Sequence, residues 1–136
     1  MSVLAMHRVF LAMSASKILR EPAPVEQRLL GEALPHVLVQ LPLFNERYVA
    51  ERIIRAATQL DYPADKLEIQ VLDDSTDDTR EIVADLVQQF ATQGVRIKHL
   101  WREDRKGYKA GALAAGLEAS CAPFVAIFDA DFVPAP

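Results

Sequence analysis

The sequence FVAIFDAD, at residues 124–131, joins a short apolar run to two acids that stand one residue apart. A run of apolar, β-prone residues such as 124–128 is typical of a buried strand. Asp129 and Asp131 follow at its carboxyl end, where open α/β sheets hold their ligands. Carboxylate oxygens there suit Mg²⁺ or Mn²⁺, which keep waters and bridge to substrate phosphates. The stretch favours a metal-bound nucleotide, although an Asp-X-Asp by itself also ends a strand in an ordinary turn.

Upstream of this stretch, apolar strands alternate with amphipathic helices from Pro35 onward. Short apolar or alternating runs at residues 36–41, 67–72 and 95–100 predict three further strands. Helical spacing of apolar residues lies between them, and Pro63 and Gly94 end the first two helices. Strands that alternate with helices predict right-handed crossovers and a parallel, Rossmann-like α/β sheet.

The polar clusters all fall on the predicted strand-to-helix turns. These turns share one edge of a doubly wound sheet, so residues scattered along the sequence are expected to form a single site. The clusters are Asn45, then Asp73 and Asp74, then residues 105–109, and finally Asp129 and Asp131.

Asp73 and Asp74 lie directly at a strand end and can accept hydrogen bonds from a nucleobase or a ribose hydroxyl. Asp77 and Asp78 are interpreted as caps of the next helix, for which Asp73 and Asp74 come too early. Phe44, on the preceding turn, offers a ring on which a base could stack, and its alternative is a place in the core.

A basic segment precedes the third helix. Arg105, Lys106 and Lys109 place positive charge at a helix start, which favours phosphate binding. Arg102 is interpreted as part of a solvated basic loop. The helix itself contains several glycines and alanines and is expected to pack closely against the sheet; the spacing is not that of a Walker P-loop.

Composition excludes several classes of function. Of 136 residues, 51% are hydrophobic and 25% are charged, and the net charge of −4 gives no footprint for nucleic acid. One cysteine, Cys121, excludes an internal disulfide, and three scattered histidines lack the spacing of a zinc site.

The amino-terminal residues 1–34 form a separate segment. Residues 1–20 hold three basic residues and no acids, and their apolar stretches are too short for a membrane span. An amphipathic helix lying on an anionic membrane face and an ordinary peripheral segment are both open. Pro22 and Pro24 then begin a connector.

Four strings, taken in order, resemble the family-2 inverting glycosyltransferases of the GT-A fold. The resemblance is closest to the cellulose-synthase-like branch that makes β-mannans and glucomannans, and it covers roughly residues 35–134. The strings are QLPLFNE at 40–46, QVLDDSTD at 70–77, GYKAGAL at 107–113 and FVAIFDADF at 124–132.

The resemblance implies a role for each matched position. It implies a divalent ion, Mg²⁺ or Mn²⁺, on Asp131 with Asp129, which also sits by the ribose. Lys109 would contact the diphosphate, and Asp74 with Asp73 beside it would bind the nucleobase. The remaining nucleotide-binding positions would be Pro42, Phe44, Asn45 and Glu46.

The resemblance also implies the reaction and its setting. The donor would be a nucleoside-diphosphate sugar of the UDP-glucose or GDP-mannose type, and the acceptor a polysaccharide or glycolipid. Residues 35–136 would be the donor-binding half of the domain. The family's catalytic base, its acceptor motif and its membrane helices lie further along such sequences, so this stretch is expected to be inactive alone. Its parent is expected at the cytoplasmic face of a membrane.

Three other classes remain as alternatives. An Asp-X-Asp at a strand end resembles the nucleophile motif of haloacid-dehalogenase-type phosphatases, but there it ends the first strand rather than the fourth. A phospho-receiver domain would need a lysine on a strand after Asp129, and Lys109 precedes it. A nucleotide-binding module without catalysis is the third alternative.

Overall fold

The computed structural model describes residues 33–132 and residue 134. The alternation predicted from the sequence is confirmed: a parallel four-stranded sheet with helices on both faces. The elements, in chain order, are β1 (Val37–Leu43), α2 (Arg47–Thr58), β2 (Leu67–Asp73), α3 (Thr79–Thr92), β3 (Ile97–Trp101), α4 (Tyr108–Glu118) and β4 (Phe124–Ile127).

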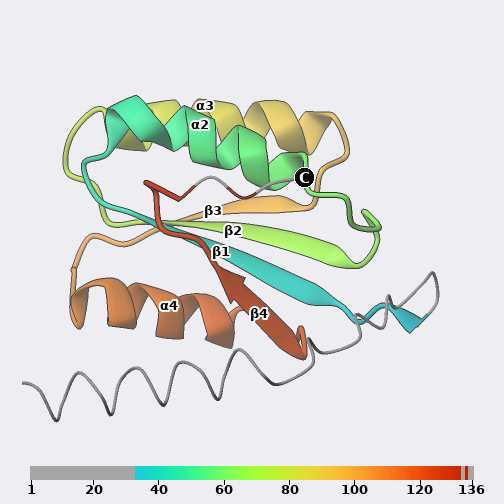
Figure 1. Ribbon diagram of the computed structural model, residues 1–136. Helices are drawn as coiled ribbons and strands as arrows, with labels where there is room; N and C mark the ends of the chain where they lie inside the picture. Colours follow the sequence, from blue (N-terminus) through green and yellow to red (C-terminus); the bar gives the residue numbers. More distant parts are fainter. Residues whose placement is uncertain (1–32, 133, 135–136) are drawn as a thin grey trace, which may run out of the picture. The chain divides into compact units, whose positions relative to one another are not determined.

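The strands lie in the order β3-β2-β1-β4, and every neighbouring pair is parallel. Helices α2 and α3 cover one face of the sheet and α4 covers the other, as Figure 1 shows. The chain therefore runs outward from β1 to β3 and then crosses back to place β4 on the other side of β1. The strand order reverses between β1 and β4, which is the position where doubly wound sheets bind ligands.

The strands carry two different faces because side chains alternate along them. Val39, Leu41, Ile69 and Val71 join the main core under α2 and α3. The alternate positions of β1 and β2 face α4 and include the fully buried Gln40, which donates to Gln70 Oε1 at 3.2 Å and to Leu113 O at 3.3 Å.

Helix α4 packs on this polar face at close range, as its glycines predict. A Cβ atom on Gly116 would lie 2.4 Å from Gln40 Nε2 and 2.7 Å from Gln70 Oε1. At Gly111 the Cβ would lie 2.0 Å from the backbone oxygen of Lys106. Gly116 therefore allows the close approach of α4 to the sheet, and Gly111 allows the close approach of α4 to the loop that precedes it.

Two expectations about strands are wrong. The first strand does not stop before Pro42 but continues to Leu43, paired with β2 through Leu43 and Asp73. The backbone groups of Gln40 point toward β4, because Gln40 O accepts from Phe128 N. Residues two apart in a strand point to the same side, so an N–H at position 42 would also point toward β4. The last β1–β4 pair is Gln40 and Ile127, so Pro42 lies beyond the paired region and its missing N–H is tolerated.

The strand β4 was also expected to be buried, and it is not. Phe124 is 58% exposed and Ile127 is 48% exposed. In the part of the chain that the structure describes, β4 is an edge strand with β1 as its only neighbour, so nothing covers its outer side.

The basic segment predicted at residues 1–34 lies almost entirely outside the described residues. Among the helices that the structure describes, none combines the length and the apolar character needed to cross a bilayer.

Candidate functional site

A cleft of about 370 Å³ opens at the carboxyl ends of β1, β2 and β4. It lies at the point where the strand order reverses, and α4 contributes residues from the other side of the sheet edge. Its lining consists of Pro42, Leu43, Phe44, Glu46, Leu72, Asp74, Arg105, Lys109, Ala112, Asp129, Ala130 and Asp131.

Seven of the nine residues predicted for the site are in that lining, and two are not. The end of β1 supplies Pro42, and the turn after it supplies Phe44 and Glu46. Asp74 directly follows β2, Lys109 lies in the first turn of α4, and the turn after β4 supplies Asp129 and Asp131. Asn45 and Asp73 do not line the cleft. The polar turns along this edge of the sheet thus line one cleft, and the binding roles assigned to these residues stay predictions.

One end of the cleft concentrates carboxylates. Partial burial and the neighbouring charges of Asp131 and Asp129 raise the pKa of Glu46 above its ordinary value, and Lys109 offsets part of this rise. Lys109 Nζ forms an ion pair with Asp129 Oδ1. Glu46, Asp129 and Asp131 together create a negative field that a divalent cation would relieve.

The donor set at this end fits a hard cation that retains waters. Asp129 and Asp131 are both exposed and offer carboxylate oxygens, the ligands that Mg²⁺ and Mn²⁺ prefer. Within the described residues, no three His, Cys, Asp or Glu side chains converge to form a closed metal site. The geometry therefore suits an ion held by one or two carboxylates and completed by phosphate oxygens rather than a structural metal centre.

A second group of cleft residues consists of a cation stacked on a ring. The guanidinium carbon of Arg105 lies 3.3 Å from the centroid of the Phe44 ring and 5.4 Å from that of Tyr108. Arg105 Nε is buried and has no hydrogen-bond partner. The sequence placed Arg105 in the basic segment expected at the site, but it gave no signal that Arg105 would stack on Phe44.

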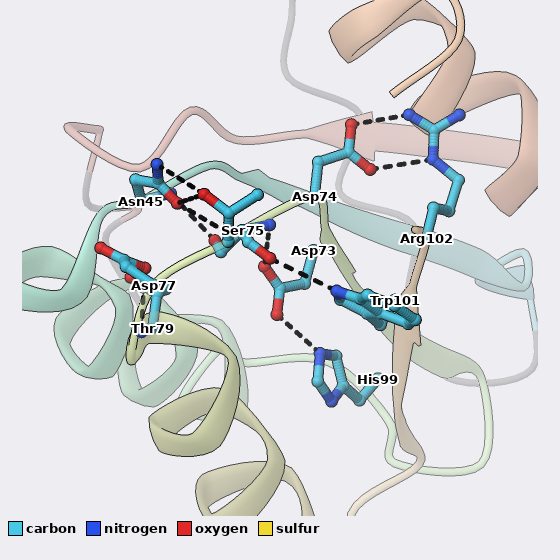
Figure 2. A network of polar contacts seen from close by, with 10 residues as sticks. Asn45, Asp73, Asp74, Ser75, Asp77, Thr79, His99, Trp101 and Arg102 are labelled. Carbon is cyan, nitrogen blue, oxygen red and sulfur yellow. Dashed lines mark hydrogen bonds and ion pairs between the residues drawn. The ribbon is translucent and has the colours of Figure 1, made fainter. Parts of the chain in front are cut away.

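Asp74 enters the cleft already paired. Its Oδ1 accepts from Arg102 Nε at 2.9 Å and its Oδ2 from Arg102 Nη2 at 2.6 Å, a two-pronged ion pair that Figure 2 shows. The same guanidinium donates to the backbone oxygens of Lys106 and Tyr108 at 3.3 and 3.1 Å. The prediction that Arg102 belongs to a solvated loop is wrong, because a carboxylate and two carbonyls hold it in place.

Asp73 is turned away from the cleft and is fully buried. Its Oδ2 lies 2.9 Å from His99 Nε2, and its Oδ1 accepts from Ser75 N at 2.8 Å. Burial alone would raise the pKa of Asp73, but the hydrogen bonds from His99 and Ser75 outweigh it, so the pKa is lowered on balance. Asp73 is therefore a charged, buried support of the turn that carries Asp74 (Figure 2).

Asn45 joins two turns instead of lining the cleft. Its backbone is left-handed, with φ of 55°, a conformation that asparagine tolerates better than most residues. Its N–H donates to Ser75 Oγ and its Oδ1 accepts from Thr76 N, both at 2.9 Å. Asn45 thereby fixes the β1–α2 turn to the β2–α3 turn (Figure 2).

The two later acids of the second turn have separate structural roles. Asp77 Oδ1 accepts from Thr79 N at 3.0 Å at the start of α3, as expected of a cap. Asp78 precedes the helix but makes no side-chain cap; its Oδ2 pairs with Arg47 Nη1 at 2.7 Å instead.

The parallel sheet, its order and the polar cleft at the point of reversal define the chain as an α/β protein of the GT-A glycosyltransferase class. The profile of the family described as glycosyl transferase family 2 matches residues 39–136. The chain therefore belongs to glycosyl transferase family 2.

Curated relatives are plant enzymes. The chain is 48% identical to glucomannan 4-beta-mannosyltransferase 2 of Arabidopsis thaliana over 85% of its own length and 22% of that protein. It is 45% identical to glucomannan 4-beta-mannosyltransferase 1 of Oryza sativa subsp. japonica, over 100% of the chain and 29% of the relative. The chain thus spans less than a third of these relatives.

Solved structures share the fold. The mannosyltransferase PcManGT from Pyrobaculum calidifontis, in complex with GDP-Man and Mn²⁺, matches with a TM-score of 0.72 and 29% identity, covering 90% of this chain and 34% of that one. TarS residues 1–349 of S. aureus in complex with UDP match with a TM-score of 0.56 and 27% identity, covering 70% of this chain and 27% of that one.

Proposed function

We propose that this chain binds the donor of a glycosyl transfer: a nucleoside-diphosphate hexose of the GDP-mannose or UDP-glucose type, together with Mg²⁺ or Mn²⁺. The observation that carries the proposal is the convergence on one cleft, at the point of strand reversal, of residues from two different turns and a helix start: Asp74, Lys109, Asp129 and Asp131. The GDP-Man and Mn²⁺ bound by the Pyrobaculum calidifontis mannosyltransferase support the choice of ligand.

Each end of the cleft would take a different part of the donor. The end with Phe44, Arg105 and Asp74 combines a ring, a planar cation and a carboxylate, which suits a nucleobase and its hydrogen-bonding edge. The end with Lys109 at the first turn of α4 and the exposed acids suits a diphosphate with its cation. Two cleft residues, Ala112 and Ala130, are small and leave space for the ligand.

Asp131 and Asp129 would hold the divalent ion, which would supply Lewis-acid stabilisation of the charge that develops on the leaving nucleoside diphosphate. Lys109 now pairs with Asp129, and it can turn its ammonium group to the diphosphate once the cation takes over that carboxylate. Glu46 adds a further negative charge beside this end and strengthens the attraction for the cation.

Inverting transfer requires a general base that removes the proton of the acceptor hydroxyl. We assign none of the cleft carboxylates to that role, because Asp74 is paired with Arg102 and the two exposed acids are assigned to the cation. For the whole protein we propose hexosyl transfer to a polysaccharide or glycolipid acceptor at the cytoplasmic face of a membrane, and no transfer by these residues alone. Sugar transfer by the purified chain would contradict the second statement.

The test is titration calorimetry of the 136-residue chain with GDP, UDP and pyrophosphate, each with Mn²⁺ and with EDTA. Binding of a nucleoside diphosphate that requires Mn²⁺ is expected. Asp131→Asn preserves volume and weakens a ligand of a hard cation, so it should reduce the metal-dependent affinity by about tenfold or more. The matched control is Asp78→Asn, whose carboxylate pairs with Arg47 outside the cleft and should leave binding unchanged.

Equal binding with Mn²⁺ and with EDTA in both proteins would refute the metal assignment. Labelling of Asp129 or Asp131 by acetyl phosphate, without affinity for nucleotides, would favour the phosphatase or receiver alternatives instead.

A further inference from the structure

A chain of polar contacts lies beside the cleft, on the face of the sheet that carries Ile69 and Val71. It runs from His99 on β3 through the carboxylate of Asp73 to the backbone of Ser75, as Figure 2 shows. Asp73 is 0% exposed and the side chain of His99 is 16% exposed. Trp101 adds a longer contact from its Nε1 to Ser75 O at 3.4 Å.

The direction of the hydrogen bond between His99 and Asp73 follows from the charge state. The hydrogen bonds that Asp73 receives lower its pKa, so its carboxylate is ionised near neutral pH and can only accept. His99 Nε2, 2.9 Å away, must therefore carry the hydrogen and donate it. This donor is one of two that hold the buried carboxylate, and the other is the N–H of Ser75.

The position of Asp73 affects the cleft because its neighbour Asp74 points the other way. Side chains alternate along β2, so Asp73 lies on the face of Ile69 and Val71, whereas Asp74 reaches Arg102 and the cleft. A rotation of the backbone at Asp73 would therefore re-aim the carboxylate of Asp74.

The same turn also reaches the aromatic side of the cleft. Ser75, whose N–H is fixed by Asp73, accepts from the N–H of Asn45 with its Oγ at 2.9 Å. Asn45 directly follows Phe44, whose ring lies under Arg105. One buried carboxylate thus influences two elements of the nucleobase end: the acid and the ring.

We propose that His99 is a positioning residue for the nucleobase end of the cleft, acting by donating to Asp73 and thereby setting the turn at residues 73–75. The inference rests on the proposed function, since it needs a nucleotide in the cleft. It assigns no contact between His99 and the ligand. Its consequence is that His99 affects recognition of the base and not of the diphosphate, which Lys109 and the exposed acids at the other end would bind.

The experiment compares two substitutions that differ in one property. His99→Phe keeps an aromatic ring and removes the donor, whereas His99→Gln keeps an N–H donor at similar reach. The control on the same strand is Lys98→Gln, which breaks the exposed ion pair with Glu68. Calorimetry with Mn²⁺ measures the affinity for GDP, UDP and pyrophosphate well below the thermal midpoint of each variant.

His99→Phe is expected to weaken binding of the nucleoside diphosphate by about tenfold, the equivalent of about 1.4 kcal/mol, and to leave pyrophosphate binding unchanged. His99→Gln should restore most of the loss, and Lys98→Gln should bind as the wild type does. If His99 had a purely structural role, its substitution would lower only the fraction of folded protein. The affinities of the folded protein for nucleotide and for pyrophosphate, and the ratio between them, would stay unchanged.

Three results would overturn the inference while the proposed function stands. They are equal losses of affinity for nucleotide and pyrophosphate, no loss with His99→Phe, and no recovery with His99→Gln. Absence of Mn²⁺-dependent nucleotide binding by the wild type would overturn the proposed function first, and the inference with it. The wild-type titration therefore separates the two failures.

Discussion

Removal of Arg102 should destabilise the protein far more than removal of an arginine from an equally short surface ion pair. The Arg102–Asp74 pair has contacts of 2.6 and 2.9 Å, and its side chains are only 19% and 5% exposed. The Arg47–Asp78 pair has a contact of 2.7 Å, but its side chains are 45% and 49% exposed. The two pairs therefore offer the same chemistry at different burial.

The magnitude follows from what Arg102→Met leaves behind. Taking one partner from a buried pair costs about 3–5 kcal/mol because an uncompensated charge remains. The partial exposure of Arg102 places the expected loss near the lower limit, about 3 kcal/mol. Arg102→Lys keeps the charge but loses the two-pronged contact with Asp74 and the hydrogen bonds to two backbone carbonyls. The expected loss in the free energy of unfolding is about half that of Arg102→Met.

Equilibrium urea unfolding, followed by circular dichroism, measures the difference. Arg47→Met should change the free energy of unfolding by a small fraction of the Arg102→Met effect. The double variant Arg102→Met, Asp74→Leu removes both charges and should recover about 2 kcal/mol relative to the sum of the two single variants. Equal costs for Arg102→Met and Arg47→Met would refute the argument from burial.

Three further results are expected. Gly116→Ala should lower the free energy of unfolding by about 1–2 kcal/mol in thermal melts, because its Cβ would meet Gln40, Gln70 and Leu72 at 2.4–2.8 Å; a stabilised variant would contradict the close packing of α4. The pKa of Asp73 is lower in the folded than in the unfolded protein, so the ionised carboxylate stabilises the fold at pH values above its unfolded pKa. This stabilisation is lost as the pH falls below about 4, and the urea midpoint of unfolding should drop there. The drop should be smaller in Asp73→Asn. Asp74→Ala should cost about 1.5–3 kcal/mol of nucleotide affinity and none for pyrophosphate with Mn²⁺, and equal losses would move Asp74 out of the base site.

Much of the fold could be predicted because its signals are local. Periodicity indicates the type and approximate position of each strand and helix, and their alternation predicts parallel pairing and a shared edge for the polar turns. That reasoning predicts that Asp74, Lys109 and Asp131 lie close together, and all three line the cleft. The tight packing of Gly111 and Gly116 was likewise foreseeable, because small residues spaced along a helix permit close approach.

The remainder depended on which side chains meet across the fold, and no local pattern encodes that. Asp73 and Asp74 are adjacent and identical in sequence, and only the pleat of β2 sends one to His99 and the other to Arg102. Arg102 resembled a loop residue because its acid partner lies on another strand. The exposure of β4 was missed because an apolar run indicates a strand but does not specify what lies on its two sides.

The pairing of β4 with β1 has a consequence for the order in which the site forms. Val37 pairs with Phe124, so this ladder joins the two ends of the sheet-forming sequence, whereas β1 pairs with β2 across a single short crossover. Distant pairings are completed late in folding because they close a long loop, and β4 contributes only four residues to the sheet. Amide protons of β4 should therefore exchange with solvent before those of β1 and β2. Because Asp129 and Asp131 follow β4 closely, a cation bound to them would stabilise β4 and slow that exchange. Binding of the cation and pairing of β4 with β1 would therefore favour each other.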